Sequence, residues 1–140
     1  MSNQITLNNC RTLRDEFSSD WREIAENMRD ETDDFEVANY RFIHDSAIDQ
    51  IQRDELESDE YILGCFNSWF LADVLELDTD VVEALQKAEA FEALGKMVID
   101  MGKLEELQQA YARTDGYGHH FASYDGHGHE ITNYHYFRIN

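Results

Sequence analysis

Apolar residues recur three or four positions apart along much of the first 112 residues, and this period constrains the fold more than any other feature. Such spacing lines one face of a helix. A first helix is predicted after a cap at Thr12, with apolar residues at Leu13, Phe17, Trp21, Ile24 and Met28. Three later series predict further helices: Ile48, Ile51 and Leu56; Ile62, Cys65, Phe66, Trp69, Phe70, Val74 and Leu77, after a cap at Ser58; and Val82, Leu85, Phe91, Leu94, Val98 and Met101, before a break at Gly102.

Two parts of the chain predict extended structure instead. Residues 35–43 are rich in aromatic and β-branched side chains and predict a strand, with an irregularity near Ala38. In the tail, residues 119–124 and 130–139 flank Asp125–Gly128, whose sequence is typical of a hairpin turn. We expect these runs to pair with each other and with the earlier strand. The predicted class is therefore α+β, mainly helical, with a small antiparallel sheet that includes a C-terminal hairpin.

The composition supplies material for one hydrophobic core. Hydrophobic residues make up 42% of the chain and aromatic residues 12%, which excludes a disordered acidic polypeptide. The chain has no proline and no Ser/Gly-rich stretch that would form a linker. We therefore expect one compact domain over 1–140, with an acidic helical part at 12–112 and a hairpin rich in His and aromatic residues at 115–140.

Acidic residues dominate the charge and are unevenly placed. Thirty Asp and Glu against eleven Lys and Arg give a formal net charge of -19. Between Asp15 and Glu60 there are seventeen carboxylates and four Arg. A folded domain gains no stability from such self-repulsion. The clustering favours a surface for a basic partner, and the alternative is a solvated face that keeps the protein soluble.

Carboxylates three or four residues apart lie on one face of a helix and can present negative charge much as DNA phosphates do. Such a surface would compete for a nucleic-acid-binding protein, in an association that weakens as salt rises. The predicted partner is therefore a basic nucleic-acid-binding protein or complex. The expected contacts are Asp15, Glu16, Asp20, Glu23, Glu26, Asp30, Glu31, Asp33, Asp34, Asp49, Asp54, Glu55, Glu57, Asp59 and Glu60.

The tail contains a cluster of histidines. Its members are His119, His120, His127, His129 and His135. Imidazoles with nearby carboxylates can bind zinc or another divalent cation, but this spacing matches no established metal motif. We predict no metal and no cofactor, and keep two alternatives: a metal site at the first four, and a patch that gains charge below neutral pH. His44 is expected to be a local cap or turn residue.

The sequence contains no recognisable enzyme motif. It has no Gly-rich phosphate loop and no nucleophile elbow, and Cys65 is expected to pack in the core. Residues 69–82 have the rhythm of a helix-turn-helix, but the second helix opens with Asp80 and Glu83 instead of Lys or Arg. We therefore expect neither catalysis nor direct nucleic-acid binding, and interpret this segment as helical packing.

Two cysteines are too few to indicate a disulfide scaffold, and the first residues lack the apolar stretch of a signal peptide. The longest apolar-rich run, 61–77, contains Asn67, Asp73 and Glu76, so no segment is expected to span a membrane. A negative surface would also be repelled by anionic lipid. We expect a cytoplasmic protein, which acts in the host cytoplasm if a phage encodes it.

Three stretches resemble parts of phage proteins: YRFI at 40–43, YILGCFNSWFLADVLELDTDVVEALQKAEAFEAL at 61–94 and YGHHFASYDGHGHE at 117–130. With its size and charge, the chain is similar to small acidic proteins of bacteriophages and mobile elements, including DNA-mimic antirestriction and anti-CRISPR inhibitors. This resemblance implies a non-enzymatic inhibitor of a host nucleic-acid-handling protein or defence complex. The aromatic tail departs from a purely acidic mimic, so a protein-binding regulatory module that acts through the tail stays an alternative.

Overall fold

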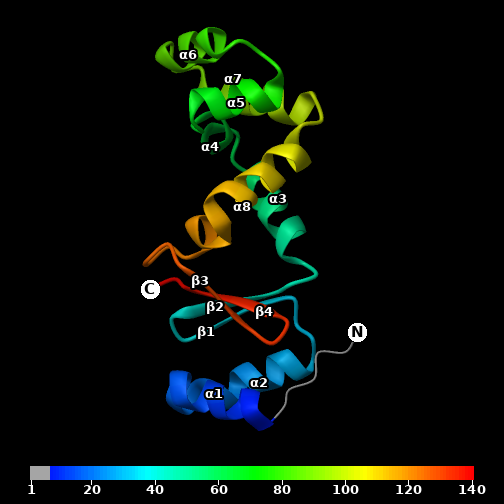
Figure 1. Cartoon of the computed structure of the whole chain (residues 1–140), viewed down its shortest axis with the longest axis vertical. Helices are drawn as coiled ribbons and strands as arrows, with labels where there is room; N and C mark the ends of the chain where they lie inside the picture. The colour runs from blue at the N-terminus through cyan, green and yellow to red at the C-terminus, as the bar shows by residue number, and fades with distance from the viewer. Residues whose placement is uncertain (1–6) are drawn as a thin grey trace. The chain divides into compact units, whose positions relative to one another are not determined.

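The computed structural model describes residues 7–140, which divide into two compact units (Figure 1). The first unit combines the chain up to Ile48 with Asp115–Asn140, and the second is the intervening segment Asp49–Thr114. The first unit contains a four-stranded sheet, and the second is helical. The predicted α+β class, mainly helical with a small antiparallel sheet, is confirmed. The single domain over 1–140 stays a prediction.

The first unit opens with two helices where the sequence predicts one. A 3-10 turn, η1 (Ser18–Asp20), separates α1 (Leu7–Phe17) from α2 (Trp21–Arg29). Ser18 has a φ of 51°, so the chain leaves the right-handed helix here and the predicted continuous helix is wrong. The apolar period survives the break, because Ile24 in α2 is fully buried.

The sheet is antiparallel, and its strands follow the order β1-β2-β4-β3. The strands are β1 (Asp34–Val37), β2 (Tyr40–His44), β3 (Gly128–Ile131) and β4 (Tyr134–Arg138). The single strand predicted over 35–43 is instead a hairpin, because Ala38 and Asn39 form a two-residue turn between Val37 and Tyr40. Ala38 has a φ of 54°, a left-handed conformation that ends the extended run where the irregularity is predicted.

The predicted C-terminal hairpin forms, but with a different turn. α8 (Leu104–Phe121) is kinked at Gly116, which has a φ of 76°, and its last part takes up residues 119–121 of the strand predicted at 119–124, so that strand is wrong. This last part packs on β4 through Phe121, with 5.2 Å between the centroids of the two aromatic rings. The hairpin joins β3 to β4 through the turn 132–133 and not through 125–128. β4 pairs with β2, which confirms the predicted pairing between the tail and the earlier strand region.

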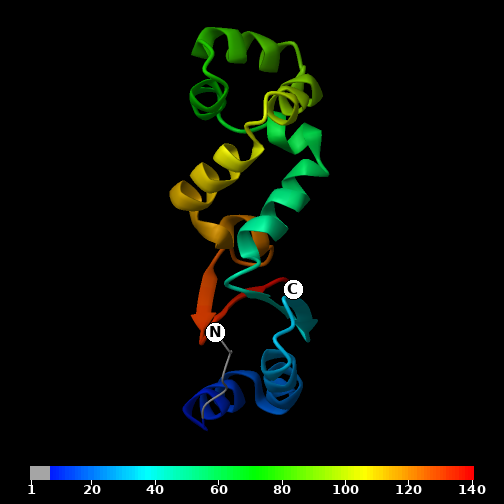
Figure 2. The same ribbon diagram turned by 90° about the vertical axis from the view of Figure 1, so that its right-hand side faces the viewer.

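The helices α1 and α2 lie against one face of the sheet (Figure 2). Aromatic rings fill the core between them. Phe17 of α1 meets Tyr40, Phe42 and Tyr136 edge to face, with 4.9, 5.5 and 5.4 Å between ring centroids. Phe35 stacks on Phe42 at 5.0 Å. Successive strand residues point to opposite faces, so each strand supplies every second side chain to this core. The core is therefore built from both ends of the chain.

Short helices build the second unit. They are α3 (Ile48–Glu57), α4 (Glu60–Gly64), α5 (Ser68–Leu75), α6 (Thr79–Lys87), α7 (Phe91–Asp100) and the first part of α8. The two long helices predicted here are each divided. Asn67 begins α5, because its side chain accepts a hydrogen bond from the Trp69 N–H at 3.2 Å. Asp59, and not the predicted Ser58, caps α4 by accepting from the Ile62 N–H at 3.1 Å.

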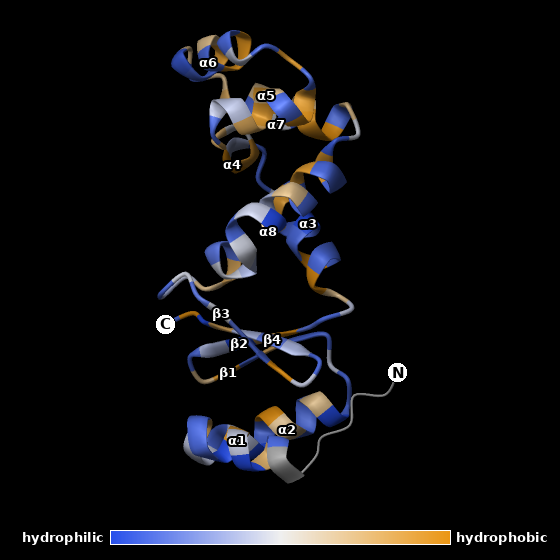
Figure 3. Ribbon diagram, in the orientation of Figure 1, coloured by the Kyte–Doolittle hydropathy of each residue, from blue (hydrophilic) through white to orange (hydrophobic). Residues whose placement is uncertain are grey.

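The core of the second unit is largely aliphatic. Leu63, Leu71, Leu94 and Val98 are among its fully or almost fully buried members. In Figure 3, α5 is coloured mainly hydrophobic, whereas α1 is mainly hydrophilic. The break predicted at Gly102 is confirmed, since α7 ends before it and α8 begins after it. Among the helices of residues 7–140, none has the length and apolar character needed to cross a bilayer.

Two glycines allow α4 and α7 to cross at close range. A side-chain carbon on Gly64 would collide with the backbone carbonyl of Phe91, and one on Gly95 would collide with that of Glu60. A larger residue at either position would force the helices apart, because protein interiors are close-packed. Both glycines are therefore required by packing.

The break between α4 and α5 exposes residues that the sequence places in one apolar stripe. The backbone leaves the helix at 65–67, so the phase of the stripe is not continuous. Ile62 is 47% exposed, Trp69 is 58% exposed, and Cys65 is also exposed. The predicted core packing of Cys65 is therefore wrong.

Candidate acidic interaction surfaces

The fifteen predicted contact carboxylates fall in both units, and each unit is described by itself. The first unit contains Asp15, Glu16, Asp20, Glu23, Glu26, Asp30, Glu31, Asp33 and Asp34. The second contains Asp49, Asp54, Glu55, Glu57, Asp59 and Glu60. The acidic block of the sequence therefore crosses the border between the units.

The helices α1 and α2 do not present one sign of charge. Five of the predicted carboxylates lie on α1, η1 and α2, and all are exposed except the half-buried Asp20. The same helices carry four exposed arginines, Arg11, Arg14, Arg22 and Arg29. A block counted from Asp15 omits the first two, although they belong to the same pair of helices. Charge on these helices is therefore nearly balanced.

Glu16 has a structural role as well as an exposed carboxylate. Its Oε2 accepts a hydrogen bond from the Tyr136 hydroxyl at 2.7 Å. Burial, followed by this hydrogen bond, raises the pKa of Tyr136 above its ordinary value. The contact joins α1 to β4 and fixes one predicted carboxylate against the sheet.

Three carboxylates of the first unit lie around one hollow. A hollow of about 400 Å³, here called the acidic hollow, is lined by Glu31, Asp33, His44, Asp45, Ser46 and Asn133. Three of these residues are carboxylates, and the lining recorded for residues 7–140 contains no Lys or Arg. Such a site suits a cationic side chain, because oxygen acceptors can replace the water around an ammonium or guanidinium group.

Backbone hydrogen bonds fix the walls of the acidic hollow. The Thr32 N–H donates to the Asn27 carbonyl at 3.0 Å, and the Tyr134 hydroxyl donates to the Thr32 carbonyl at 2.8 Å. The His44 N–H donates to the Asp33 carbonyl at 2.7 Å. The loop that carries two of the carboxylates is therefore held against the sheet before any partner binds.

His44 caps a turn in this wall, as the sequence predicts. Its Nδ1 accepts from the Ser46 N–H at 3.1 Å and lies 2.8 Å from the Ser46 hydroxyl. Asp45 is 2.9 Å from the Nε2 of His135, and Glu130 is 3.5 Å from the Nδ1 of the same ring. The position of Asp45 beside the hollow is therefore set by β4.

Asp34 differs from its neighbours because a cation already occupies it. Both carboxylate oxygens accept from the Arg41 guanidinium, at 2.9 and 2.7 Å, across the first hairpin. A two-point pair of this kind has defined geometry. This predicted contact residue is therefore already paired with a cation of its own unit.

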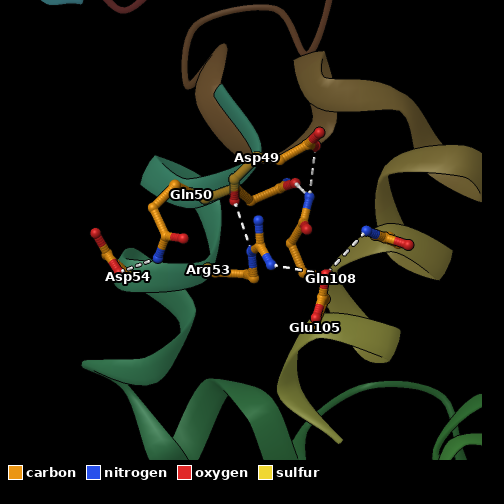
Figure 4. A network of polar contacts seen from close by, with 8 residues as sticks. Asp49, Gln50, Arg53, Asp54, Glu105 and Gln108 are labelled. Atoms are coloured by element: carbon orange, nitrogen blue, oxygen red, sulfur yellow. Dashed lines mark hydrogen bonds and ion pairs between the residues drawn. The ribbon is translucent and has the colours of Figure 1, made fainter. Parts of the chain in front are cut away.

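Several predicted contacts of the second unit also have partners within it. Asp54 accepts from the Gln50 amide at 2.8 Å, and Asp59 caps α4. Asp49 accepts from the Gln108 amide at 2.9 Å (Figure 4). The exposed carboxylates Glu57 and Glu60 lie on α3 and α4.

The bond to Asp49 belongs to a buried polar pair between α3 and α8. The amide of Gln108 also donates to the Oε1 of Gln52 at 2.9 Å, and both glutamines are fully buried. The Nε2 of Gln52 and the Oε1 of Gln108 have no hydrogen-bond partner. Such atoms cost free energy, because burial removes the water that would pair with them.

The histidine cluster does not converge. His120 lies against Phe121 and His129 stacks on Tyr136, with 4.6 and 5.0 Å between ring centroids. Within residues 7–140, no three His, Cys, Asp or Glu side chains are grouped so that they could hold a metal ion. His119 and His127 are exposed on α8 and in the loop before β3.

Most of the tail aromatics form core, although Tyr124 is 59% exposed. Phe121, Tyr134, Tyr136 and Phe137 are all buried. Asn133 also lines the acidic hollow, but its position in the sequence does not indicate this. The antiparallel pairing of β4 with β2 brings the turn at 132–133 beside the acidic loop. A hairpin turn predicted at 132–133 would have indicated that Asn133 belongs to this site.

Comparison of the chain with models of protein families, with curated proteins and with solved structures finds no match. The excess of carboxylates and the acidic hollow beside β2 are the features of this chain that bear on its function.

Proposed function

We propose that this protein is a non-enzymatic acidic inhibitor that binds a basic nucleic-acid-handling protein or defence complex in the cytoplasm. Its carboxylates occupy positions on the partner where nucleic-acid phosphates would bind. Antirestriction and anti-CRISPR inhibition are the two forms of this activity that the resemblance to small acidic phage proteins implies. The net charge of -19 supports the proposal, because long-range attraction would guide a basic partner to the surface.

The acidic hollow is the observation that carries the proposal. Glu31, Asp33 and Asp45 line a recess that has room for a Lys or Arg side chain. Nucleic-acid-binding proteins present such side chains to phosphates. A Lys or Arg side chain of the partner that inserts into the hollow would contact these carboxylates in place of a nucleic-acid phosphate.

The test is plaque formation on a panel of bacterial strains, each of which carries one restriction or CRISPR system and expresses this protein. The expected result is restored plaque formation in at least one strain. A variant with Glu31→Gln, Asp33→Asn and Asp45→Asn should lose most of this protection, because it removes three contacts at exposed carboxylates that contribute about 0.2–1 kcal/mol each.

The matched control is Asp15→Asn, Glu23→Gln and Glu26→Gln, which removes the same charge from the balanced helices of the same unit. It should retain most of the protection. Equal activity of the two variants would assign the effect to total charge and not to the hollow. Protection in no strain of the panel would contradict the proposed inhibition of restriction and CRISPR systems.

A further inference from the structure

An open hollow on the second unit is lined by Trp69 and by two carboxylates. Trp69, Asp73 and Glu76 stand at i, i+4 and i+7 along α5 and its last turn, a spacing that places them on one helical face. The hollow has a volume of about 440 Å³ and is lined by Trp69, Ala72, Asp73, Glu76, Leu77 and Thr79. Here it is called the tryptophan hollow.

The indole is open to solvent and packs on one neighbouring ring. The backbone N–H of Trp69 donates to the Asn67 side chain at 3.2 Å and so fixes the start of the helix that carries the indole, and the indole meets Phe70 edge to face at 6.1 Å between centroids. More than half of the side chain, 58%, is nevertheless exposed. A large aromatic ring left open to solvent beside a recess is typical of a contact residue.

The charge around the indole is negative. Asp73 has no ion-pair partner within residues 7–140, and Glu76 meets Lys103 only at 3.6 Å through a highly exposed carboxylate. Glu76 also has a φ of 57°, a left-handed position at the helix end where glycine is preferred. Position 76 therefore carries a glutamate although its backbone conformation favours glycine.

We propose that the tryptophan hollow binds an arginine-bearing segment of a protein partner. The planar guanidinium stacks on the face of the indole and donates hydrogen bonds to the carboxylates of Asp73 and Glu76. Lysine fits less well, because its ammonium group cannot stack or bond in the same plane. The inference goes beyond the proposed function, since it names the recognised side chain and does not require the acidic hollow.

The test uses a Trp21→Phe background, in which Trp69 is the sole tryptophan and reports binding by its fluorescence. The probes are a synthetic peptide of alternating arginine and glycine, its lysine counterpart and its uncharged citrulline counterpart, at near-physiological salt. The arginine peptide should quench Trp69 and bind more tightly than the lysine peptide. Asp73→Asn should weaken it by about threefold, the scale of an exposed ion pair.

Glu92→Gln is the matched control, because it removes one exposed charge from α7 of the same unit outside this hollow. It should weaken binding less than Asp73→Asn does. Equal effects of these two variants, or equal affinity for the arginine and lysine peptides, would overturn the proposal. Self-association that Trp69→Phe abolishes, without peptide binding, would assign the face to a second copy and also overturn it. The plaque assay of the acidic-hollow variants tests the proposed function separately.

Discussion

The two units of this chain achieve stability in different ways. The first packs aromatic rings between two helices and a sheet that needs both ends of the chain, and the second packs aliphatic side chains among helices from one continuous segment. The first carries fourteen carboxylates against six Lys and Arg, and the second sixteen against five. The balances are therefore -8 and -11, so most of the excess lies on the aliphatic unit.

The carboxylates of the two units are also arranged differently. The unit that contains the balanced α1 and α2 has three carboxylates around one hollow, whereas the other unit has two carboxylates beside an exposed tryptophan. Removal of the tail after Arg113 would delete β3 and β4, and with them half of the strands of the sheet. Such a truncation therefore tests the fold of the first unit and not a role of the tail.

The largest expected effect is on the aromatic core. Phe42→Ala removes a fully buried ring that stacks with Phe35 and Tyr136 at 5.0 and 5.5 Å, and should cost the first unit about 4 kcal/mol. Hydrogen exchange read by mass spectrometry should show faster exchange in peptides from β2 and β4. Peptides from α5 and α7 should keep wild-type rates, because their core is separate. Equal acceleration in both sets would show that the units unfold together.

The corresponding test of the aliphatic unit is Gly95→Ala. The new methyl group collides with the backbone of α4, and forcing the crossing apart should cost about 3 kcal/mol, more than alanine gains in helix propensity. The same exchange measurement should now show acceleration in α4, α5 and α7. Ala93→Val, at an exposed position of α7, is the matched control and should cost only about 0.5 kcal/mol. A loss no greater than that of the control would contradict the close crossing.

A smaller effect on stability is expected for the buried pair Gln52 and Gln108 of the second unit. Gln108→Leu leaves the buried amide of Gln52 without a partner and should destabilise the unit by about 2 kcal/mol in urea unfolding. Adding Gln52→Leu removes the remaining buried amide and should restore stability to the wild-type value or above it. A double variant that is still less stable than the wild type would show that the pair contributes more free energy than it costs.

The sequence predicts the class of the fold because its two periods are strong. Helical spacing through Ile24 and through Leu94, and alternation near Phe42, each report a buried face, and these faces are buried. Boundaries are predicted less well, because single residues decide them. Ser18 and Ala38 adopt positive φ without glycine, so ordinary turn chemistry does not mark these breaks.

The candidate sites are predictable only in part. A run of charged residues is visible in the sequence, whereas a hollow is lined by residues from distant parts of the chain. The acids at 30–34 are recognised from composition, but Asp45 and Asn133 join them only through strand pairing. Trp69 appears as core in a continuous helical stripe. The cap at Asn67 shifts the phase and turns that ring outward, which the apolar pattern alone does not reveal.

The smallest expected effect concerns the Tyr136 hydroxyl, which joins the aromatic core to Glu16 of α1. Tyr136→Phe removes the hydrogen bond of 2.7 Å and should cost about 1 kcal/mol near neutral pH, since the acceptor is exposed. Burial and Glu16 raise the pKa of Tyr136 in the folded protein, so the stabilisation is fully present below the unfolded pKa near 10 and declines as pH rises above it. Urea unfolding from neutral pH to about pH 11 should therefore give the variant a flatter profile above pH 10 than the wild type. Tyr124→Phe, at an exposed tyrosine of the same unit, is the matched control, and an identical slope in the wild type and Tyr136→Phe would contradict the contact.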